Sequence, residues 1–274
     1  MNSILSQVEA WPVEQVAAGA IGPGSTSLQH GPTSQIFKLA SVTKPLVALA
    51  VLVAVEEGTL SLDQPAGPPG STIKHLLAHA SGLALDNNEI LAPVGTRRIY
   101  SNTGYETLGA ALYEHSGLPV AQYLHEAVLE PLGMSNTVLG GSPAHGATSS
   151  VDDLLLLGNE LLNPNGRILS DETIELATQV AFPNLAGVLP GYGPQTQNDW
   201  GLGFEIRDSK EPHWTPPQAS PKTFGHFGRS GSVFWVDPVA EVCLVVLGNR
   251  DFGEWATPLW QDLGSKVLTA LTRG

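Results

Sequence analysis

The chain has 274 residues, of which 42% are hydrophobic and 14% are charged. This length and apolar content favour one compact unit, with room for two lobes that share an interface, and exclude a disordered or coiled-coil protein. The net charge of −13 and the lack of a Lys/Arg run argue against nucleic acid or an anionic membrane as partner. We therefore expect small-molecule partners, and the sequence leaves the oligomeric state open.

The N-terminal sequence MNSILSQVEAWPVEQ lacks the basic segment and long apolar stretch of an export signal. The longest apolar run, residues 45–55, is too short to span a bilayer. We therefore predict a cytoplasmic protein, provided that no leader has been removed. The single cysteine, Cys243, lies in an apolar run, so we interpret it as a small buried hydrophobic residue rather than a nucleophile.

The N-terminal third is predicted to contain a short helix over residues 2–10, two strands joined by a Gly-Pro-Gly turn, and a long apolar helix. The strands are Val13–Ile21 and Ser25–His30, and the helix is Ser41–Glu57, ended by a glycine. Pro45 lacks a backbone donor and is tolerated only in a first turn, so this helix is expected to begin near Ser41.

Helices are predicted through the middle of the chain and strands near its end. After a Pro/Gly-rich loop over residues 61–70, the expected helices are Ser71–His79 (with Ser71 as N-cap), Thr103–His115, Val120–Val128, Asp152–Leu162 and Asp171–Val180. The expected strands are Gly201–Arg207, Phe224–Gly228, Ser232–Asp237 and Val242–Asn249, followed by a final helix over Thr257–Leu271.

Strands at both ends with helices between them predict an α+β fold. In this fold one antiparallel β-sheet, built from both termini, is flanked by helices and carries an inserted all-helical lobe. The predicted division assigns residues 1–62 and 165–274 to the sheet domain and residues 63–164 to the helical lobe, with the active site between them.

The pattern S-x-x-K occurs at Ser41–Lys44 and again at Ser71–Lys74. On a helix, residues three apart lie on one face with Cβ atoms about 5–6 Å apart, so a Lys amine can reach a Ser hydroxyl. A desolvated lysine can act as a base and so activate serine without a His–Asp pair. The N-cap role explains Ser71 completely. Ser41 opens the longest apolar helix, which would hold a nucleophile rigidly, so the first copy is favoured.

Two further motifs contain side chains suited to a catalytic pocket. Tyr100-Ser101-Asn102 can present a phenol and an amide to one pocket, although a half-buried tyrosine beside a helix-capping Asn102 explains it too. His226-Phe227-Gly228 lies on a predicted strand, whose edge can supply a backbone N–H to an oxyanion. A similar His-Ser-Gly at residues 115–117 ends a helix, where its glycine fits a C-cap.

Ser-x-x-Lys, Tyr-x-Asn and His-x-Gly, in this order, resemble the family of class C β-lactamases, D-Ala-D-Ala carboxypeptidases and β-lactamase-fold esterases. The segments HLLAHASGL (75–83), YSNTGYETLG (100–109), LEPLGM (129–134), WGLGFE (200–205) and GHFGRSGSVFWVDP (225–238) are similar to that family as well. The resemblance implies a cofactor-free serine hydrolase that forms an acyl-enzyme.

The resemblance also implies a role for each matched position. Ser41 would attack the carbonyl, and Lys44 and Tyr100 would share the general-base work. Asn102 would bond the substrate's amide and help to hold Lys44, and His226 would support Tyr100 or polar groups of the substrate. The backbone N–H groups of Ser41 and Arg229 would form the oxyanion hole, with Gly228 beside the substrate.

The substrate class is less certain than the nucleophile, because Phe227 occupies a position where relatives often carry a hydroxyl residue that binds the β-lactam carboxylate. The sequence therefore favours an esterase or amidase acting on small substrates, with a true β-lactamase or D,D-peptidase, or a non-catalytic penicillin-binding sensor, as alternatives. Arg229 could meet an anionic group or be a solvated surface residue. His75 and His79 are interpreted as helix-face and capping residues, because HLLAH lacks the glutamate of H-E-x-x-H, and no metal is expected.

Overall fold

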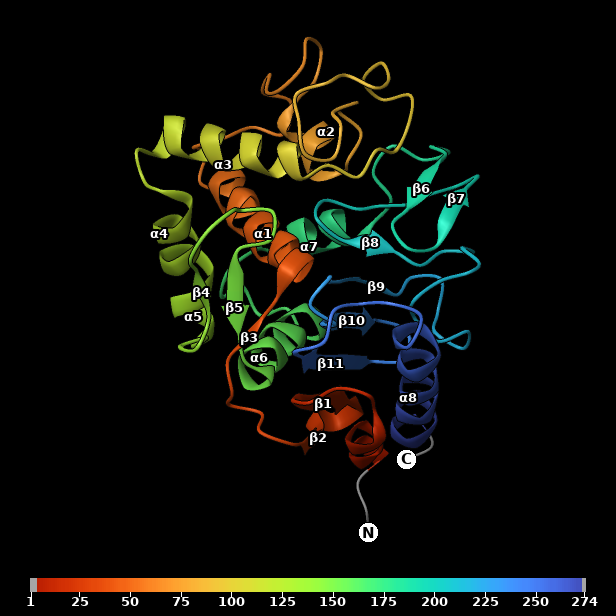
Figure 1. Ribbon diagram of the computed structural model, residues 1–274. Coiled ribbons are helices and arrows are strands. Elements are labelled where there is room, and N and C mark those ends of the chain that lie inside the picture. Colours follow the sequence, from red (N-terminus) through yellow and green to blue (C-terminus); the bar gives the residue numbers. More distant parts are fainter. Residues whose placement is uncertain (1–3, 273–274) are drawn as a thin grey trace.

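The computed structural model describes residues 4–272 and is built on a six-stranded antiparallel sheet (Figure 1). The strand order is β2-β1-β11-β10-β9-β8, so strands from both ends of the chain lie side by side. Their bounds are β1 (Val16–Gly22), β2 (Thr26–His30), β8 (Glu205–Ile206), β9 (Phe224–Phe227), β10 (Val233–Asp237) and β11 (Val242–Gly248). The predicted α+β fold, with an antiparallel sheet assembled from both termini, is confirmed.

Helices cover both faces of this sheet. Helix α8 (Ala256–Leu271) and the 3-10 helix η1 (Ile4–Ala10) lie on one face, and α6 (Val151–Leu162) lies on the other (Figure 1). Strand β11 is buried throughout, with alternate residues in two separate cores. Cys243 faces the α6 side, so its predicted role as a buried apolar residue is confirmed.

Helix α1 (Thr43–Glu56) runs through the interior, and every residue from Thr43 to Ala54 is buried. A helix that is apolar on all sides can remove its side chains from water only inside a core, which explains why this segment becomes the central helix. It begins two residues later than predicted, because Ser41 lies in a 3-10 turn (Ala40–Val42) that leads into it. Pro45 accordingly lies in the first turn, as expected.

The remaining helices lie between α1 and β8 in the chain. The helices are α2 (Ile73–Leu77), α3 (Asn102–Ser116), α4 (Val120–Leu124), the π-helical turn η4 (His125–Leu129), α5 (Glu130–Leu132) and α7 (Asp171–Thr178). Small pairings that the sequence analysis did not predict are β3 (Phe37–Lys38), β4 (Val138–Leu139), β5 (Ala147–Ser149), β6 (Gly187–Leu189) and β7 (Gly193–Gln195), with a 3-10 turn η2 (Pro23–Ser25) after β1.

Several predicted elements need correction. The strand predicted over Gly201–Arg207 shrinks to β8, because the N–H groups of Leu202 and Gly203 donate to the carbonyls of Ala177 and Leu77 at two helix ends. Ser71 is not an N-cap: Thr72 holds that position, without a side-chain capping bond. The predicted helix over residues 2–10 is a 3-10 helix from Ile4, and its first two residues lie outside the described part.

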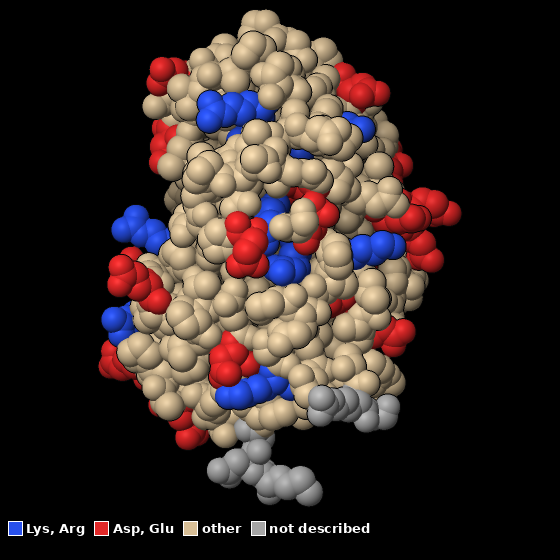
Figure 2. Space-filling view, turned by 90° about the vertical axis from the view of Figure 1, so that its right-hand side faces the viewer, with Lys and Arg blue, Asp and Glu red and all other residues tan. Residues whose placement is uncertain are grey.

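The domain boundary at residues 164 and 165 stays a prediction, although α6, which it assigns to the helical lobe, packs on β11 and β1. Within residues 4–272, no helix is both long and apolar enough to cross a membrane. On the face shown in Figure 2, basic side chains are scattered among acidic ones instead of forming a stripe.

Gly158 in α6 sets how closely this helix approaches β11. A Cβ at this position would overlap the Sγ of Cys243. Gly158→Ala would normally stabilise a helix, but here we expect it to lower the free energy of unfolding by roughly 1–3 kcal/mol through overpacking. Denaturant unfolding measures this. The Gly158→Ala/Cys243→Ala double variant should be more stable than the sum of the single changes, and simple additivity would contradict the contact.

Candidate active site

Ser41 lies on a strained turn that the sheet holds in place. The preceding residue, Ala40, has a φ of 46°, which is unfavourable for any residue with a Cβ. The carbonyl of Leu39 accepts a 2.7 Å hydrogen bond from the hydroxyl of Ser232, and the carbonyl of Lys38 accepts one of 2.7 Å from Ser230. Two serines of the β9–β10 loop therefore fix the backbone immediately before Ser41.

Gly228 allows the end of β9 to lie against this turn, because a Cβ there would overlap the carbonyl oxygen of Leu39. The Gly228 carbonyl accepts a 3.0 Å bond from the N–H of Gly231. In a planar trans peptide the N–H points away from the C=O, so this bond directs the Arg229 N–H to the opposite side. The Arg229 side chain is 87% exposed and lies 3.4 Å from Asp251.

Lys44 lies one helical turn after Ser41, with its Nζ 3.4 Å from the Ser41 Oγ. In a 3-10 turn residues three apart eclipse, so the late start of α1 keeps both side chains on one face. The Nζ also donates to Asn102 Oδ1 at 2.7 Å and to the carbonyl of Ala144 at 2.9 Å. Burial lowers the pKa of Lys44 to about 7, against the charges of Asp86 and Glu106, which raise it.

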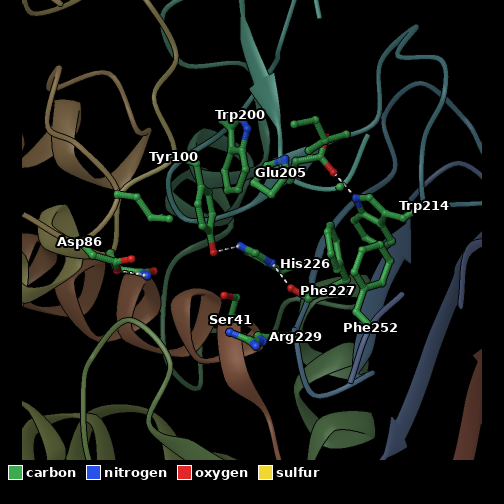
Figure 3. Close-up of a pocket in the computed structure, with 15 residues that line it drawn as sticks. Ser41, Asp86, Tyr100, Trp200, Glu205, Trp214, His226, Phe227, Arg229 and Phe252 are labelled. Carbon is green, nitrogen blue, oxygen red and sulfur yellow. Dashed lines mark hydrogen bonds between the residues drawn. The ribbon is translucent and has the colours of Figure 1, made fainter. Parts of the chain in front are cut away.

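Tyr100 and His226 complete the site around Ser41. The Lys44 Nζ lies 4.5 Å from the centre of the Tyr100 ring, and Figure 3 shows the phenol directed at the imidazole. The Tyr100 hydroxyl is 3.4 Å from His226 Nε2, and His226 Nδ1 is 2.6 Å from the Phe227 carbonyl oxygen. Burial and the nearby Lys44 lower the pKa of His226 to about 3, so the ring is neutral. Its one N–H therefore sits on Nδ1 and donates to the Phe227 carbonyl, which leaves Nε2 to accept the Tyr100 O–H.

Burial also raises the pKa of Tyr100, while a hydrogen bond with Ser41 lowers it. Burial is the larger effect, so the phenol is neutral. The phenol thus links Ser41 to His226, and the lysine contacts the serine independently.

Asn102 is the first residue of α3, and the helix N-cap is Ser101, whose hydroxyl accepts from the Gly104 N–H at 3.0 Å. The capping interpretation of Asn102 is therefore wrong. Its amide is free to accept from Lys44 and to donate to Asp86 Oδ1 at 2.7 Å. Asp86 lies in a loop, and sequence reasoning missed it because no periodic element places it near the serine.

These side chains open into a pocket of about 310 Å³. Trp200 lines the pocket, whereas Trp235 lies in the core beneath α8, a distinction that the sequence alone left open. Figure 3 shows an aromatic wall opposite Tyr100. The ring of Phe227 packs within about 6 Å, centroid to centroid, of the rings of Tyr192, Trp214, Phe252 and Trp260.

A buried ionic cluster supports the aromatic wall. Glu205 accepts from the Trp214 indole N–H at 2.5 Å, contacts His213 at 2.9 Å and pairs with Lys210. These partners outweigh burial and hold the pKa of Glu205 at about 2, so its carboxylate is charged. The cluster fixes the Trp214 ring at the pocket. Within it, the positive charge of Lys210 balances the negative charge of Glu205.

His79 has a second role that sequence reasoning missed. Its predicted capping role is confirmed: it follows α2 with a φ of 55°, and the N–H groups of His79 and Ala80 donate to the carbonyls of Leu76 and His75. Its buried ring also packs on Tyr100 (4.7 Å between centroids) and Trp200 (4.6 Å). Its carbonyl accepts from the Ile99 N–H at 2.9 Å and its Nδ1 accepts from the Ser101 N–H at 3.1 Å. It therefore also holds the chain on both sides of Tyr100, which is a positioning role.

The competing motifs lie elsewhere. The Ser71 hydroxyl is buried with no hydrogen-bond partner among the described residues, and Lys74 lies over the Phe182 ring. Gly117 ends α3 with a φ of 73°, which confirms its C-cap role. His75 stacks on Phe182 rather than facing His79, and among residues 4–272 no cluster of three or more His, Cys, Asp or Glu is suited to a metal.

Comparison with known proteins identifies the family. The Beta-lactamase family profile matches residues 16–264, and the chain therefore belongs to the β-lactamase family, as its three ordered motifs predicted. A β-lactamase from Mycobacterium bovis is 54% identical in sequence and superposes with a TM-score of 0.96, over 98% of this chain and 100% of that one.

More distant relatives share the fold. A mutant simvastatin synthase from Aspergillus terreus superposes with a TM-score of 0.80 at 17% identity, over 98% of this chain and 93% of that one. A protein of Escherichia coli O157:H7, named "Putative D-alanyl-D-alanine carboxypeptidase", is 24% identical over 221 residues, which cover 60% of this chain and 48% of that protein. The chain thus spans about half the length of the curated relatives it matches.

Asp86 should control the protonation of Lys44. Its carboxylate favours the ammonium form, so Asp86→Asn lowers the pKa of Lys44 further. If Lys44 acts as a base, ester hydrolysis rises as the pH passes through the lysine's pKa, and we expect this rise to occur at lower pH in the variant. A pH profile of kcat/KM at low salt measures it. Asp262→Asn, on α8, is the control, and an unchanged or raised midpoint in Asp86→Asn would contradict the coupling.

His79 should affect turnover through Tyr100. His79→Asn retains an acceptor for the Ser101 N–H and tolerates a positive φ, whereas His79→Leu leaves that N–H unpaired. We expect kcat to fall roughly tenfold in His79→Leu and clearly less in His79→Asn, with KM little changed. Thermal melts separate this from unfolding. Equal loss of kcat in both variants would reduce His79 to a packing residue.

Proposed function

We propose that this protein is a serine hydrolase that forms an acyl-enzyme on Ser41 and cleaves small esters or amides. The observation that supports this most directly is Lys44: a buried lysine with a pKa near 7, its Nζ 3.4 Å from the Ser41 hydroxyl. Near neutral pH much of this lysine is deprotonated, so it can accept the serine proton. Catalytic hydrogen bonds of this length tighten when substrate arrives.

In the proposed reaction, Ser41 Oγ attacks the substrate carbonyl while its proton passes to Lys44. The C–O or C–N bond to the leaving group then breaks, the leaving group takes up the proton that Lys44 received, and the acyl group stays on Ser41. Water hydrolyses this ester in the reverse sense, releasing the acid. The Tyr100 phenol stays protonated, so in our proposal Lys44 is the base. The Tyr100 hydroxyl, which His226 holds in place, relays the serine proton or orients the serine hydroxyl.

The oxyanion hole is proposed to consist of the backbone N–H groups of Ser41 and Arg229. The Gly231–Gly228 hydrogen bond orients the second N–H, and the close approach of Gly228 to Leu39 brings the two peptides together. Figure 3 shows Arg229 beside Ser41. Preorganised donors of this kind stabilise the charge that develops on the carbonyl oxygen.

Neutral esters fit this pocket better than anionic β-lactams. Phe227 offers no hydroxyl to a carboxylate, and the Arg229 side chain faces solvent beside Asp251. Asp86 at the rim would repel an anion. The M. bovis relative, which is described as a β-lactamase, favours the alternative of β-lactam hydrolysis. A non-catalytic penicillin-binding sensor is the third candidate.

Ser41→Ala tests the proposal. We expect it to reduce hydrolysis of p-nitrophenyl acetate by at least about a thousandfold, because the nucleophile has no substitute. The Ser71→Ala variant is the matched control and should retain activity. Unchanged ester turnover in Ser41→Ala would rule out the assigned nucleophile. Nitrocefin hydrolysis faster than ester hydrolysis would select the β-lactamase alternative, and a stable penicillin adduct on Ser41 without turnover would select the sensor.

A further inference from the structure

We propose that an apolar groove beside the catalytic pocket binds an aliphatic chain of the substrate, so that this hydrolase prefers medium-chain acyl esters to acetyl esters. This inference rests on the proposed function. The groove is lined by Leu85, Leu91, Arg97, Arg98, Ile99, Tyr100, Val188 and Pro190, and has a volume of about 360 Å³.

Large apolar side chains are unusually exposed along this groove. Leu85, Leu91 and Val188 are 46%, 50% and 50% exposed, and the neighbouring Ile90 is 54% exposed. Scattered exposed apolar residues are normal, but three that line one hollow at the mouth of a site, with a fourth beside them, indicate a binding surface. An apolar ligand would remove this surface from water.

Backbone pairing forms the groove before any ligand binds. Leu83 and Ile90 form an antiparallel bridge, and the Leu91 N–H donates to the Gly82 carbonyl at 2.8 Å. On the opposite wall, Arg98 and Gly187 form a parallel bridge next to Val188. A groove built in this way needs little ordering when a chain enters, which favours affinity.

The charges of the groove select an uncharged ligand. Arg98 is buried, but its guanidinium donates to the carbonyls of Ala78, Asn198, Ala181 and Phe182 at 2.5–3.0 Å. Arg97 is exposed, so its charge is solvated at the rim. The buried lining therefore presents no unpaired donor to a carboxylate or phosphate, and a methylene chain is the chemistry that fits.

The position of the groove identifies its occupant as part of the substrate. Leu85, Tyr100 and Pro190 line both the groove and the pocket that contains Ser41. A chain attached to a carbonyl at Ser41 can thus pass between Leu85 and Pro190 without crossing solvent. A separate protein partner would instead block the entrance to the serine.

The acyl-chain profile of hydrolysis tests this inference. We expect kcat/KM for p-nitrophenyl octanoate to exceed that for the acetate by roughly tenfold or more, since each buried methylene contributes about threefold to fourfold. Val188→Asp places a charge in the groove and should lower octanoate kcat/KM by roughly tenfold while leaving acetate within about twofold. Leu91→Asp should act in the same direction. Both residues are half-exposed, so folding is expected to be preserved.

Val239→Asp is the matched control, because it makes the same change at an exposed position between β10 and β11. It should leave both substrates unaffected. A flat chain profile, or a Val188→Asp variant that loses acetate and octanoate activity equally, would overturn the groove while the hydrolase proposal stands. Absence of turnover for both esters, together with no acylation of Ser41, would overturn the proposed function and the groove with it.

Discussion

The site depends on an ammonium group held inside a hydrophobic core. Lys44 is fully buried because α1 is apolar on every side, and a charge in such a place is stable only when acceptors surround it. Asn102 and the Ala144 carbonyl supply those acceptors, and both come from segments far along the chain. Burial favours the neutral amine, whereas the charges of Asp86 and Glu106 favour the ammonium. The balance between them gives a lysine that can gain or lose a proton near neutral pH.

The sheet fixes the position of the nucleophile Ser41, as the core fixes the position of Lys44. The turn before Ser41 is strained at Ala40 and persists because Ser230 and Ser232 bind its carbonyls. These serines follow β9, which also contains His226. One structural unit therefore fixes the serine, the proposed oxyanion donor and the partner of Tyr100, while α1 and α3 fix the lysine and the amide. Relative motion of the two groups would separate the proposed oxyanion donor and His226 from the lysine and the amide.

The order of the motifs was enough to predict the family and to predict that five side chains lie close together, because each motif lies on or beside an element with a clear sequence signature. These side chains are Ser41, Lys44, Tyr100, Asn102 and His226. Ser41 was separated from Ser71 by helix context and by the ordered partners Tyr100, Asn102 and His226. The N-cap role assigned to Ser71 was wrong, because Thr72 holds that position. His79 could not be recognised in this way. Its HLLAH setting reads as a helix end, and only the tertiary approach of residues 99–101 gives its ring a partner. The strand predicted at Gly201–Arg207 failed for the same reason, since remote helix ends accept its N–H groups.

In this site the walls that would contact the substrate, which include Phe227, are distinct from the polar groups that would react with it. The Phe227 ring belongs to the aromatic wall of the pocket, and Glu205, which orients Trp214 in that wall, is fully paired. The groove near Val188 repeats this pattern on the other side, where the only buried cation is paired with carbonyls. Between these walls, a line of hydrogen-bonding groups runs from Lys44 through Ser41 and Tyr100 to the His226 imidazole. A substrate that binds through carboxylate contacts would find few partners on these walls, whereas an uncharged ester loses only water from its apolar parts and places its single reactive dipole on that line.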